Sequence, residues 1–195
     1  GRILDFDIGG GSFEFSTGTN ALPDAAMSVP LGAGRLTREF FDEQPPSPKQ
    51  VKRLRKYVRE QIAPVAENLL RYGAPDMTVG TSKTFRSLAR ICGAAPYSAG
   101  PHVKREMHLQ DLRLWTRRME AMTVEERSDL PGVSKARAEQ ILAGAIAAEA
   151  AMEAFGVETM RVCPWALREG LILKRIEHLA EGTGTPVNPK TLLGE

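Results

Sequence analysis

Eight consecutive residues near the start of the chain, from Asp7 to Glu14, combine two carboxylates with three successive glycines. Gly9, Gly10 and Gly11 let backbone N–H groups approach a phosphate without interference from a Cβ atom, and such a concave nest of N–H groups binds anions. Carboxylate oxygens are ligands that Mg²⁺ prefers, and bound Mg²⁺ bridges to substrate phosphates. The segment therefore predicts metal-assisted phosphoryl transfer. A plain hairpin with solvated acids is the alternative, and it is the more common case for an isolated glycine triplet.

Apolar and polar side chains alternate on both sides of this turn, which is typical of half-buried strands. Residues 3–8 alternate up to the glycines, and residues 12–16 alternate again after them. We therefore expect the two segments to pair as a hairpin with its glycine turn at the sheet edge. In that hairpin Phe13 enters the core, while Asp7 and Glu14 point to the same side with room between them for a metal ion or its waters.

A second candidate phosphate contact follows a short predicted strand at residues 77–79. Gly80, Thr81 and Ser82 stand between that strand and a predicted helix, where free N–H groups at the helix N-terminus can receive a phosphate or the edge of a nucleotide. For an isolated match, an ordinary helix N-cap at Thr81 or Ser82 is the better explanation. Lys83 adds a positive charge there or simply faces solvent.

The elements that must position these residues follow an α/β order. Helices, read from apolar positions three or four residues apart, are expected at 51–69, 83–92, 108–128, 135–155 and 167–176. Two more strands are expected at 26–29 and 159–162. Ser134 is placed as the N-cap and Gly156 as the C-terminal stop of the helix at 135–155. This order predicts a mixed sheet that starts with an antiparallel hairpin and is flanked by helices, and it matches the ribonuclease-H-like unit among several α/β options.

The bulk composition restricts the function classes. A chain of 195 residues that is 42% hydrophobic is long enough for one well-filled core. With 26 basic and 24 acidic side chains, the net charge of +2 indicates neither nucleic acid nor a membrane surface as a partner. Cys92 and Cys163 form no CxxC pair, which fits a reducing cytoplasm, and no segment predicts a membrane span or a secretion signal. Because the chain begins at Gly1 and runs at once into a strand, we interpret it as a piece cut at a domain boundary.

Five motifs occur together in a recognisable order. They are DIGGGSFE at 7–14, PLGAGRLT at 30–37, VGTSKT at 79–84, LPGVS at 130–134 followed by Arg137, and PWALREG at 164–170. This set resembles the exopolyphosphatase / guanosine pentaphosphate phosphohydrolase family, a branch of the actin, Hsp70 and sugar kinase superfamily. The matches cover nearly the whole chain, and five ordered elements are far more specific than one glycine loop.

The resemblance implies a fold, an activity and a site. Residues 1–180 would be the second ribonuclease-H-like lobe and residues 181–195 a flexible tail, with the first lobe absent from this chain. The activity implied is cytoplasmic hydrolysis of the terminal phosphate of inorganic polyphosphate or guanosine pentaphosphate, by Mg²⁺-assisted in-line attack of water. The implied phosphate contacts are Gly9, Gly10, Gly11, Ser12, Gly80, Thr81 and Ser82, with Asp7 and Glu14 as the catalytic and metal-binding residues. The general base is implied to be a glutamate of the first lobe, so we expect the isolated chain to be inactive.

Two residues depart from the family pattern. Phe13 replaces a usual threonine, which removes a hydroxyl that can face phosphate or backbone, and Lys83 stands where glycine is common. Both are interpreted as variation of an actinobacterial branch. Arg137 either reaches toward the site or decorates its helix, and the basic run at 49–59 is more typical of a solvated helix face than of a polyphosphate track.

Two other classes of function remain open from the sequence. A sensor of the same fold would bind a nucleotide or polyphosphate without hydrolysis, and Phe13 favours this reading mildly while Asp7 and Glu14 oppose it. A structural or homodimerising module would explain the helices but not a glycine triplet flanked by acids. Arg168 and Glu169 are adjacent in the chain and cannot pair with each other on a helix, so we expect them to anchor a helix start.

Overall fold

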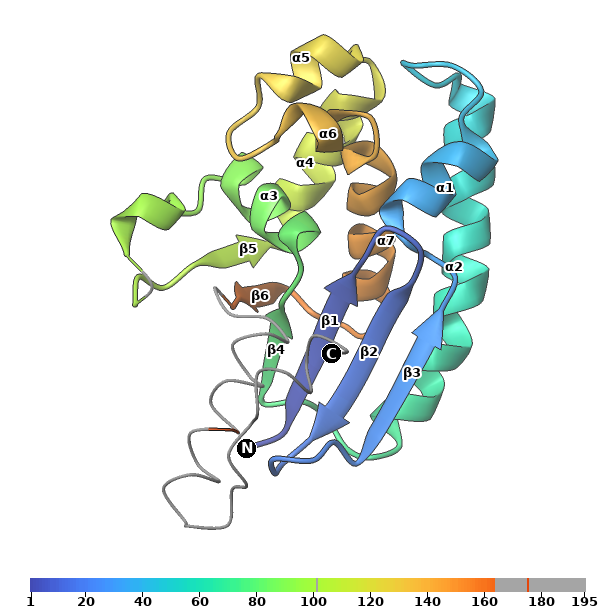
Figure 1. Ribbon diagram of the computed structural model, residues 1–195. Helices are drawn as coiled ribbons and strands as arrows, with labels where there is room; N and C mark the ends of the chain where they lie inside the picture. Colours follow the sequence, from blue (N-terminus) through green and yellow to red (C-terminus); the bar gives the residue numbers. More distant parts are fainter. Residues whose placement is uncertain (101, 164–174, 176–195) are drawn as a thin grey trace, which may run out of the picture. The chain divides into compact units, whose positions relative to one another are not determined.

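The structure is a computed structural model that describes residues 1–100, 102–163 and 175 (Figure 1). The described residues up to 163 belong to one compact unit, Gly1–Pro164. Apart from Arg175, the predicted last helix at 167–176 lies outside the described residues. So do Arg168, Glu169 and the predicted tail at 181–195.

The strands of the described chain form one mixed sheet with the order β3-β2-β1-β4-β6-β5. They are β1 (Ile3–Ile8), β2 (Phe13–Gly18), β3 (Ala25–Val29), β4 (Met77–Gly80), β5 (Glu106–His108) and β6 (Thr159–Val162). β2 pairs antiparallel with both β1 and β3, whereas β4 runs parallel to both β1 and β6. The predicted hairpin and the mixed sheet are therefore confirmed. Because β1 and β4 are parallel neighbours, the residues that follow them meet at the same edge of the sheet.

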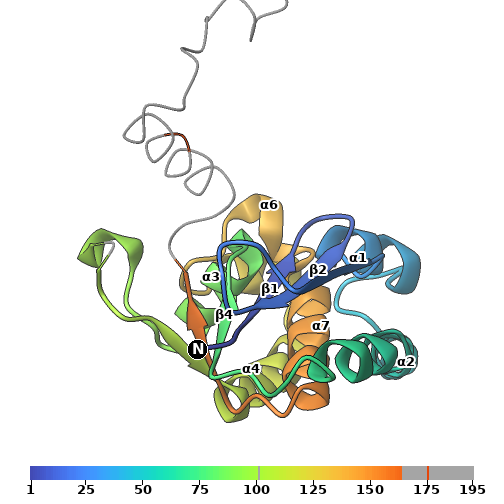
Figure 2. The same cartoon turned by 90° about the horizontal axis from the view of Figure 1, so that it is seen from below.

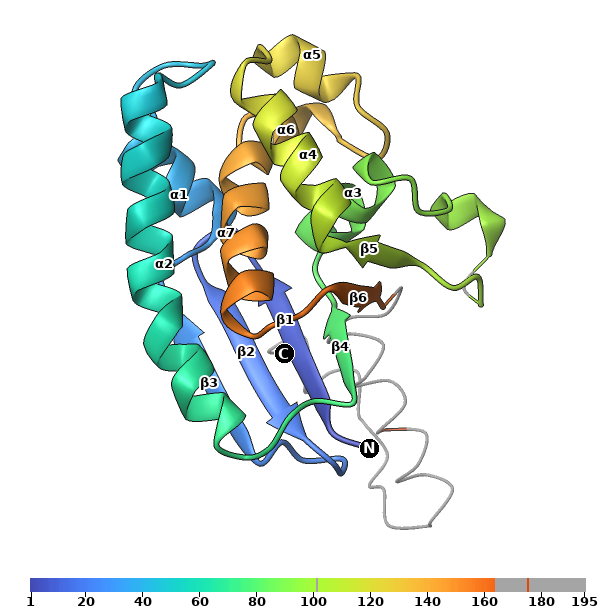
Figure 3. The ribbon, with the colours of Figure 1, turned by 180° about the vertical axis from the view of Figure 1, so that it is seen from behind.

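The helices of the described chain pack mainly against one face of this sheet. They are α1 (Ala33–Phe40), α2 (Pro48–Leu70), α3 (Lys83–Ile91), η1 (Tyr97–Ala99), α4 (Leu109–Glu120), α5 (Val124–Ser128), α6 (Lys135–Ala138) and α7 (Ile141–Ala154). α2 and α7 cover the back of β1, β2 and β3, as Figures 1 and 3 show from opposite sides. Figure 2 shows β1 and β2 as a layer above α7 and α2. No helix in the described ranges combines the length and the apolarity that crossing a membrane requires.

Aromatic rings fill the space between the sheet and its helices. Phe6 of β1 lies 5.2 Å, centroid to centroid, from Phe15 of β2 and 5.2 Å from Phe155, which follows α7. Phe13 stacks on Phe15 at 4.0 Å, and Phe85 of α3 lies 6.3 Å from Phe6. All five rings are buried, so this face of the hairpin is tied into the core and its opposite face must carry the polar residues.

Several local features differ from the sequence expectation. The helix expected at 108–128 is divided into α4 and α5, because Thr123 caps a new helix start through a capping box with Glu126. The sequence reading missed α1 and β5, which are short and have too few residues to show a periodicity. The helix expected at 135–155 is broken at Gln140 into α6 and α7, and the Ser134 side chain makes no capping hydrogen bond. α7 is buried nearly all round, which its alanines permit, whereas α6 stays at the surface. Gly156 ends α7 with φ of 66°, as predicted.

Candidate active site

Asp7 and Glu14 lie directly opposite each other on neighbouring strands. The register of β1 and β2 pairs Asp7 with Glu14 and Ile8 with Phe13. Phe13 is fully buried, so both carboxylates project from the other face of the hairpin, as the alternation predicted. The Ser28 hydroxyl on β3 donates to Oε1 of Glu14 at 3.0 Å, which fixes that carboxylate from the side away from Asp7.

The glycine turn between the two strands leaves its N–H groups open. The Gly9 N–H donates to the Ser12 carbonyl at 3.0 Å, so this group is used by the turn itself. Within the described residues, no backbone carbonyl accepts from the N–H groups of Gly10, Gly11 or Ser12. Gly10 and Gly11 are both exposed. Three of the four predicted N–H groups are therefore available to an anion, and that of Gly9 is not.

The fold itself does not require glycine at positions 10 and 11. Neither residue has the left-handed backbone that favours glycine, and a Cβ placed on either would meet no described atom within 4 Å. The absent Cβ atoms therefore leave open space in front of the turn. This space is what a phosphate needs to reach the backbone N–H groups at hydrogen-bonding distance.

Helix α1 holds the glycine turn from behind. The N–H groups of Ala33 and Arg35, at the start of the helix, donate to the carbonyls of Gly9 and Gly10 at 3.0 and 2.9 Å. Gly32 lies against the turn so closely that a Cβ there would be 2.4 Å from the Gly11 nitrogen. The turn's carbonyls are thus drawn toward α1. The sequence reading recognised this segment only as a motif and missed its contact with the turn.

The second predicted segment meets the first through Thr81. The Thr81 hydroxyl donates to Oδ2 of Asp7 at 3.2 Å, and its N–H donates to the Phe6 carbonyl at 3.0 Å. Ser82 is the N-cap of α3 and accepts from the Phe85 N–H at 3.2 Å, so the ordinary capping interpretation describes its side chain.

Gly80 has a structural reason to be glycine. A Cβ at this position would lie 2.7 Å from Sδ of Met160 and 3.0 Å from Cβ of Phe85. The residue is buried between β6 and α3. Of the three residues in this segment, Thr81 is therefore the one that contacts the candidate site directly.

Asp5 is a neighbour of the site that the sequence reading did not select. It lies two residues before Asp7 on the same strand and so on the same face. Burial, together with the charge of Asp7, raises the pKa of the Asp5 carboxyl to about 6. Its Oδ1 atom is buried and has no hydrogen-bond partner among the described residues. The alternation of residues 3–8 already places Asp5 on the same face of the strand as Asp7, and this could have identified it.

The surroundings of Asp7 shift its pKa in two opposite directions. Burial is the largest effect and raises the pKa of Asp7, and the Glu14 carboxylate adds to this. The Thr81 hydrogen bond and the charge of Arg86 on α3 act in the opposite direction. A cation or a hydrogen-bond donor in front of the two carboxylates would therefore relieve their mutual repulsion.

Comparisons with known proteins assign this chain to a family. The model of the Ppx/GppA phosphatase family matches residues 1–179. The chain belongs to this family. It is 49% identical over 183 residues to Exopolyphosphatase 1 of Mycobacterium leprae and 51% identical over 183 residues to Exopolyphosphatase 1 of Mycobacterium tuberculosis. Each match covers 94% of this chain, and 54% and 53% of the respective relative, so the chain spans about half the length of these curated relatives.

Solved structures of the Ppx/GppA family share the fold. The crystal structure of the Aquifex aeolicus family member has a TM-score of 0.80 at 26% identity, over 95% of this chain and 58% of that one. An exopolyphosphatase from Cytophaga hutchinsonii has a TM-score of 0.76 at 22% identity, over 93% of this chain and 58% of that one. The predicted ribonuclease-H-like, actin-type α/β fold is thus confirmed.

The two departures from the family pattern have different consequences in the structure. The side chain at position 13 points into the core, so Phe13 removes no hydroxyl from the phosphate side of the hairpin. Lys83 is exposed on the first turn of α3, beside the segment that contacts Asp7. Phe13 therefore changes the packing of the core, whereas Lys83 adds a positive charge near the site.

The donor set fits Mg²⁺ in kind. No three histidine, cysteine, aspartate or glutamate side chains converge on a metal position in the described part of the chain. Mg²⁺, however, is usually held by one or two carboxylates while waters and substrate phosphates complete its octahedron. Asp7 and Glu14 supply such a pair, and the unpartnered oxygen of Asp5 lies on the same face.

Proposed function

We propose that this chain supplies one side of the site of a phosphohydrolase that removes the terminal phosphate from inorganic polyphosphate, guanosine pentaphosphate or both. The observation that carries the proposal is the open turn at Gly10 and Gly11, whose free N–H groups stand beside Asp7 and Glu14. The family match and the relatives named exopolyphosphatase support the choice of substrate class.

The residues of the turn and those around it have separate tasks. The N–H groups of Gly10, Gly11 and Ser12 hold the terminal phosphate and stabilise the charge on its oxygens as water attacks in line. Asp7 and Glu14 would hold a Mg²⁺ ion, which would neutralise phosphate charge. Thr81 and Ser28 keep the two carboxylates in position through the hydrogen bonds described above.

The reaction also needs a second phosphate-holding surface and a general base. In the family resemblance both come from the preceding lobe, with a glutamate as the base. Because positioning and charge stabilisation supply nearly all of the rate in phosphoryl transfer, half of the site should give little turnover. We therefore propose that the 195-residue chain alone is inactive.

A non-catalytic sensor is the weaker proposal. Its only support in the sequence was Phe13, and this side chain is packed in the core with no described role on the phosphate side. The paired carboxylates beside the open turn favour hydrolysis, because they suit a metal ion that stabilises the charge of a reacting phosphate.

The experiment compares phosphate release by the 195-residue chain and by the two-lobe protein. Inorganic polyphosphate and guanosine pentaphosphate are each tested with and without Mg²⁺. We expect no appreciable release by the chain alone and Mg²⁺-dependent release by the two-lobe protein. Asp7→Ala or Glu14→Ala should reduce that rate by about 10²–10⁴.

Glu60→Ala is the matched control, because it removes an exposed carboxylate of α2 that pairs only with Lys56 in the described structure. Its rate should equal that of the unchanged protein. Strong turnover by the 195-residue chain, or an unchanged rate in Glu14→Ala, would show that the chemistry lies in other residues.

A further inference from the structure

Asp5 carries a carboxyl oxygen that the fold buries without a hydrogen-bond donor. Its Oδ1 atom is buried, and no described residue donates to it. The register places Asp5 opposite Ser16 of β2 and Val79 of β4, so its neighbours across the sheet are one small hydroxyl side chain and one apolar side chain. A buried acceptor without a donor destabilises a fold. The sheet alone therefore gives no reason for an aspartate at this position.

Asp5 is too far from Asp7 to share a metal ion with it. Residues two apart on a strand are separated by about 6.6 Å along the strand. The oxygen ligands of one Mg²⁺ ion lie about 3–4 Å from each other, because each is about 2.1 Å from the ion. Consistent with this spacing, no three carboxylates in the part of the chain that the structure describes are arranged to hold a metal ion. Asp5 therefore belongs to the surroundings of the metal position and not to its ligands.

The Thr81 hydroxyl links Asp5 to Asp7. It donates to Oδ2 of Asp7 at 3.2 Å and lies 3.5 Å from the Phe6 carbonyl oxygen. Burial raises the pKa of Asp5, the charge of Asp7 raises it further, and hydrogen bonding to the Thr81 side chain acts against both. A threonine hydroxyl has a single hydrogen, so it cannot serve two carboxylates at full strength at the same time. While this hydrogen is directed to Asp7, Asp5 lacks a full hydrogen bond.

A cation at Asp7 changes which acceptor the hydroxyl prefers. A cation bound to the Asp7 carboxylate weakens its attraction for a hydrogen-bond donor, whereas the Asp5 carboxylate keeps its own. The Thr81 backbone is held by its N–H, which donates to the Phe6 carbonyl at 3.0 Å. The hydroxyl hydrogen, by contrast, rotates about the C–O bond. A turn of this one group therefore frees Oδ2 of Asp7 for the cation and gives Asp5 a donor.

We propose that Asp5 is a positioning residue of the metal site, because it accepts the Thr81 hydrogen bond that Asp7 gives up when Asp7 binds a cation. Asp5 does not touch the ion, and it acts on the ion through Thr81. The inference rests on the proposed function for the presence of a cation at Asp7 and Glu14. It accounts for an aspartate whose hydrogen bonding is incomplete without the cation.

The test measures the Mn²⁺ affinity of the 195-residue chain at pH 7.5, from the electron paramagnetic resonance signal of the free ion. Asp5→Asn should weaken Mn²⁺ binding about tenfold, as the loss of a group that orients a metal ligand typically does. Asp5→Leu, which removes both the charge and the acceptor, should weaken it at least as much. Asp129→Asn removes an exposed carboxylate instead and should leave the affinity within about twofold.

Unfolding in urea separates this role from a structural one. A residue needed only for the fold would lower stability and Mn²⁺ affinity together when it is replaced. Both Asp5 variants should instead keep or raise the stability, because they remove a buried carboxylate that is incompletely bonded. An unchanged Mn²⁺ affinity in both variants, or an affinity loss that accompanies lower stability in both, overturns the proposal.

A double-mutant cycle tests the route through Thr81. In the Thr81→Val chain, which has no hydroxyl, Asp5→Asn should change the Mn²⁺ affinity by less than about threefold. In the Thr81→Ser chain, which keeps the hydroxyl, the loss of about tenfold should return. A loss of the same size in all three backgrounds would show that Asp5 acts by its charge alone and would overturn the positioning role.

The proposed function and this inference can fail separately. Asp7→Ala and Glu14→Ala should abolish Mn²⁺ binding. If binding persists in both variants, or if the unchanged chain binds no Mn²⁺, the metal site and the role of Asp5 are both wrong. If Asp7→Ala loses Mn²⁺ and the Asp5 variants do not, only the role of Asp5 is wrong. A two-lobe protein that releases no phosphate, combined with weaker Mn²⁺ binding in the Asp5 variants, would remove the function and keep the role of Asp5.

Discussion

Asp5 shows how one residue can link the stability of the fold to the chemistry of the site. Its carboxyl has a pKa of about 6 in the folded chain, against 3.8 for an ordinary aspartate. The raised pKa means that the folded state holds this proton more tightly than the unfolded state does. Stability contributed by the protonated form is therefore present below about pH 4 and is lost as the pH rises through about 6.

We predict that Asp5→Asn stabilises the fold at pH 7.5 by about 1–3 kcal/mol, because it removes a buried charge whose pKa is raised by about two units. The gain should disappear at pH 4, where the carboxyl is protonated. Urea unfolding at the two pH values measures the difference. Asp129→Asn, which removes an exposed carboxyl, is the control. An equal gain at both pH values would contradict the assignment of a buried, ionised Asp5.

The exposed glycines of the turn allow a second prediction at the residue scale. A methyl group on Gly10 or Gly11 meets no described atom, so Gly10→Ala and Gly11→Ala should leave unfolding within about 1 kcal/mol or stabilise slightly. The same methyl groups occupy the space in front of the free N–H groups. We expect phosphate release by the two-lobe protein to fall at least tenfold, measured beside urea unfolding. Full activity in both variants would show that no phosphate approaches this turn.

At the scale of elements, α1 and the glycine turn act as one unit. The helix N-terminus holds the Gly9 and Gly10 carbonyls, and Gly32 is the point of closest approach. The orientation of the turn's free N–H groups therefore depends on the backbone of this helix. α3 has the corresponding place on the other side, because its N-cap follows Thr81.

We predict that Gly32→Ala destabilises the protein by about 1–3 kcal/mol or more, because its Cβ would overlap backbone atoms of Gly11 and Ser12 that cannot rotate away. Thermal unfolding measures the loss. Gly10→Ala serves as the glycine control, because a Cβ there meets no described atom and Gly10 has no positive φ. If Gly32→Ala unfolds at the same temperature as the unchanged protein, α1 does not pack on the turn as described.

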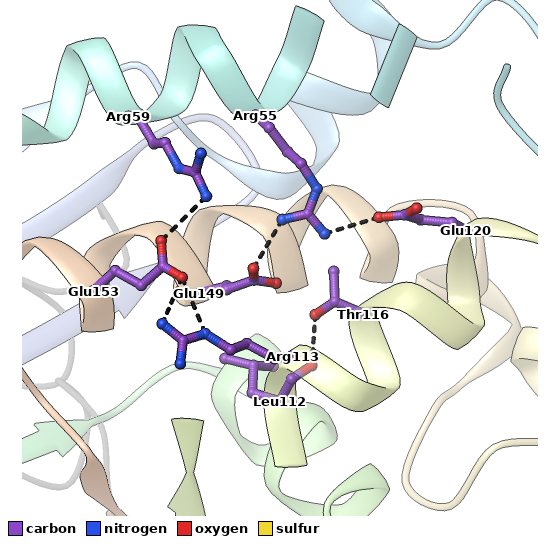
Figure 4. Close-up of polar contacts among 8 residues, drawn as sticks. All are labelled: Arg55, Arg59, Leu112, Arg113, Thr116, Glu120, Glu149 and Glu153. Atoms are coloured by element: carbon purple, nitrogen blue, oxygen red, sulfur yellow. Dashed lines mark hydrogen bonds and ion pairs between the residues drawn. The ribbon is translucent and has the colours of Figure 1, made fainter. Parts of the chain in front are cut away.

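At the scale of the whole molecule, a chain of ion pairs joins the helices behind the sheet (Figure 4). Arg55 of α2 bridges Glu149 of α7 and Glu120 of α4, and the Glu149 side chain is only 8% exposed. Glu153 of α7 has two partners, Arg59 and Arg113. These contacts hold three helices in register over the sheet that carries the site.

The two arginines of α2 should differ in importance. Arg55→Ala leaves the buried Glu149 without its partner, so we predict a loss of about 3–5 kcal/mol in the free energy of unfolding. Arg59→Ala should cost less than about 1 kcal/mol, because Arg59 is 58% exposed and Glu153 keeps Arg113. Urea unfolding of both variants at pH 7.5 tests this. Equal losses would mean that burial of Glu149 does not govern the network.

The sequence by itself determined the features that depend on local periodicity. The alternation of residues 3–8 and 12–16 predicted the hairpin, the burial of Phe13 and the shared face of Asp7 and Glu14, because successive side chains of a strand must point to opposite faces. The long helix α2 was equally readable from its apolar stripe. The ordered motifs also indicated the family, which the match over residues 1–179 confirmed.

Only the tertiary structure decided which distant residues meet. Thr81 reaches Asp7 because β4 lies parallel to β1, and Gly32 touches Gly11 because α1 turns back onto the hairpin. Gly132 brings Arg137 beside α3 through a contact across 45 residues. Such contacts leave no periodic signal, since they arise when separate elements pack against one another and not from the order of residues within any one of them.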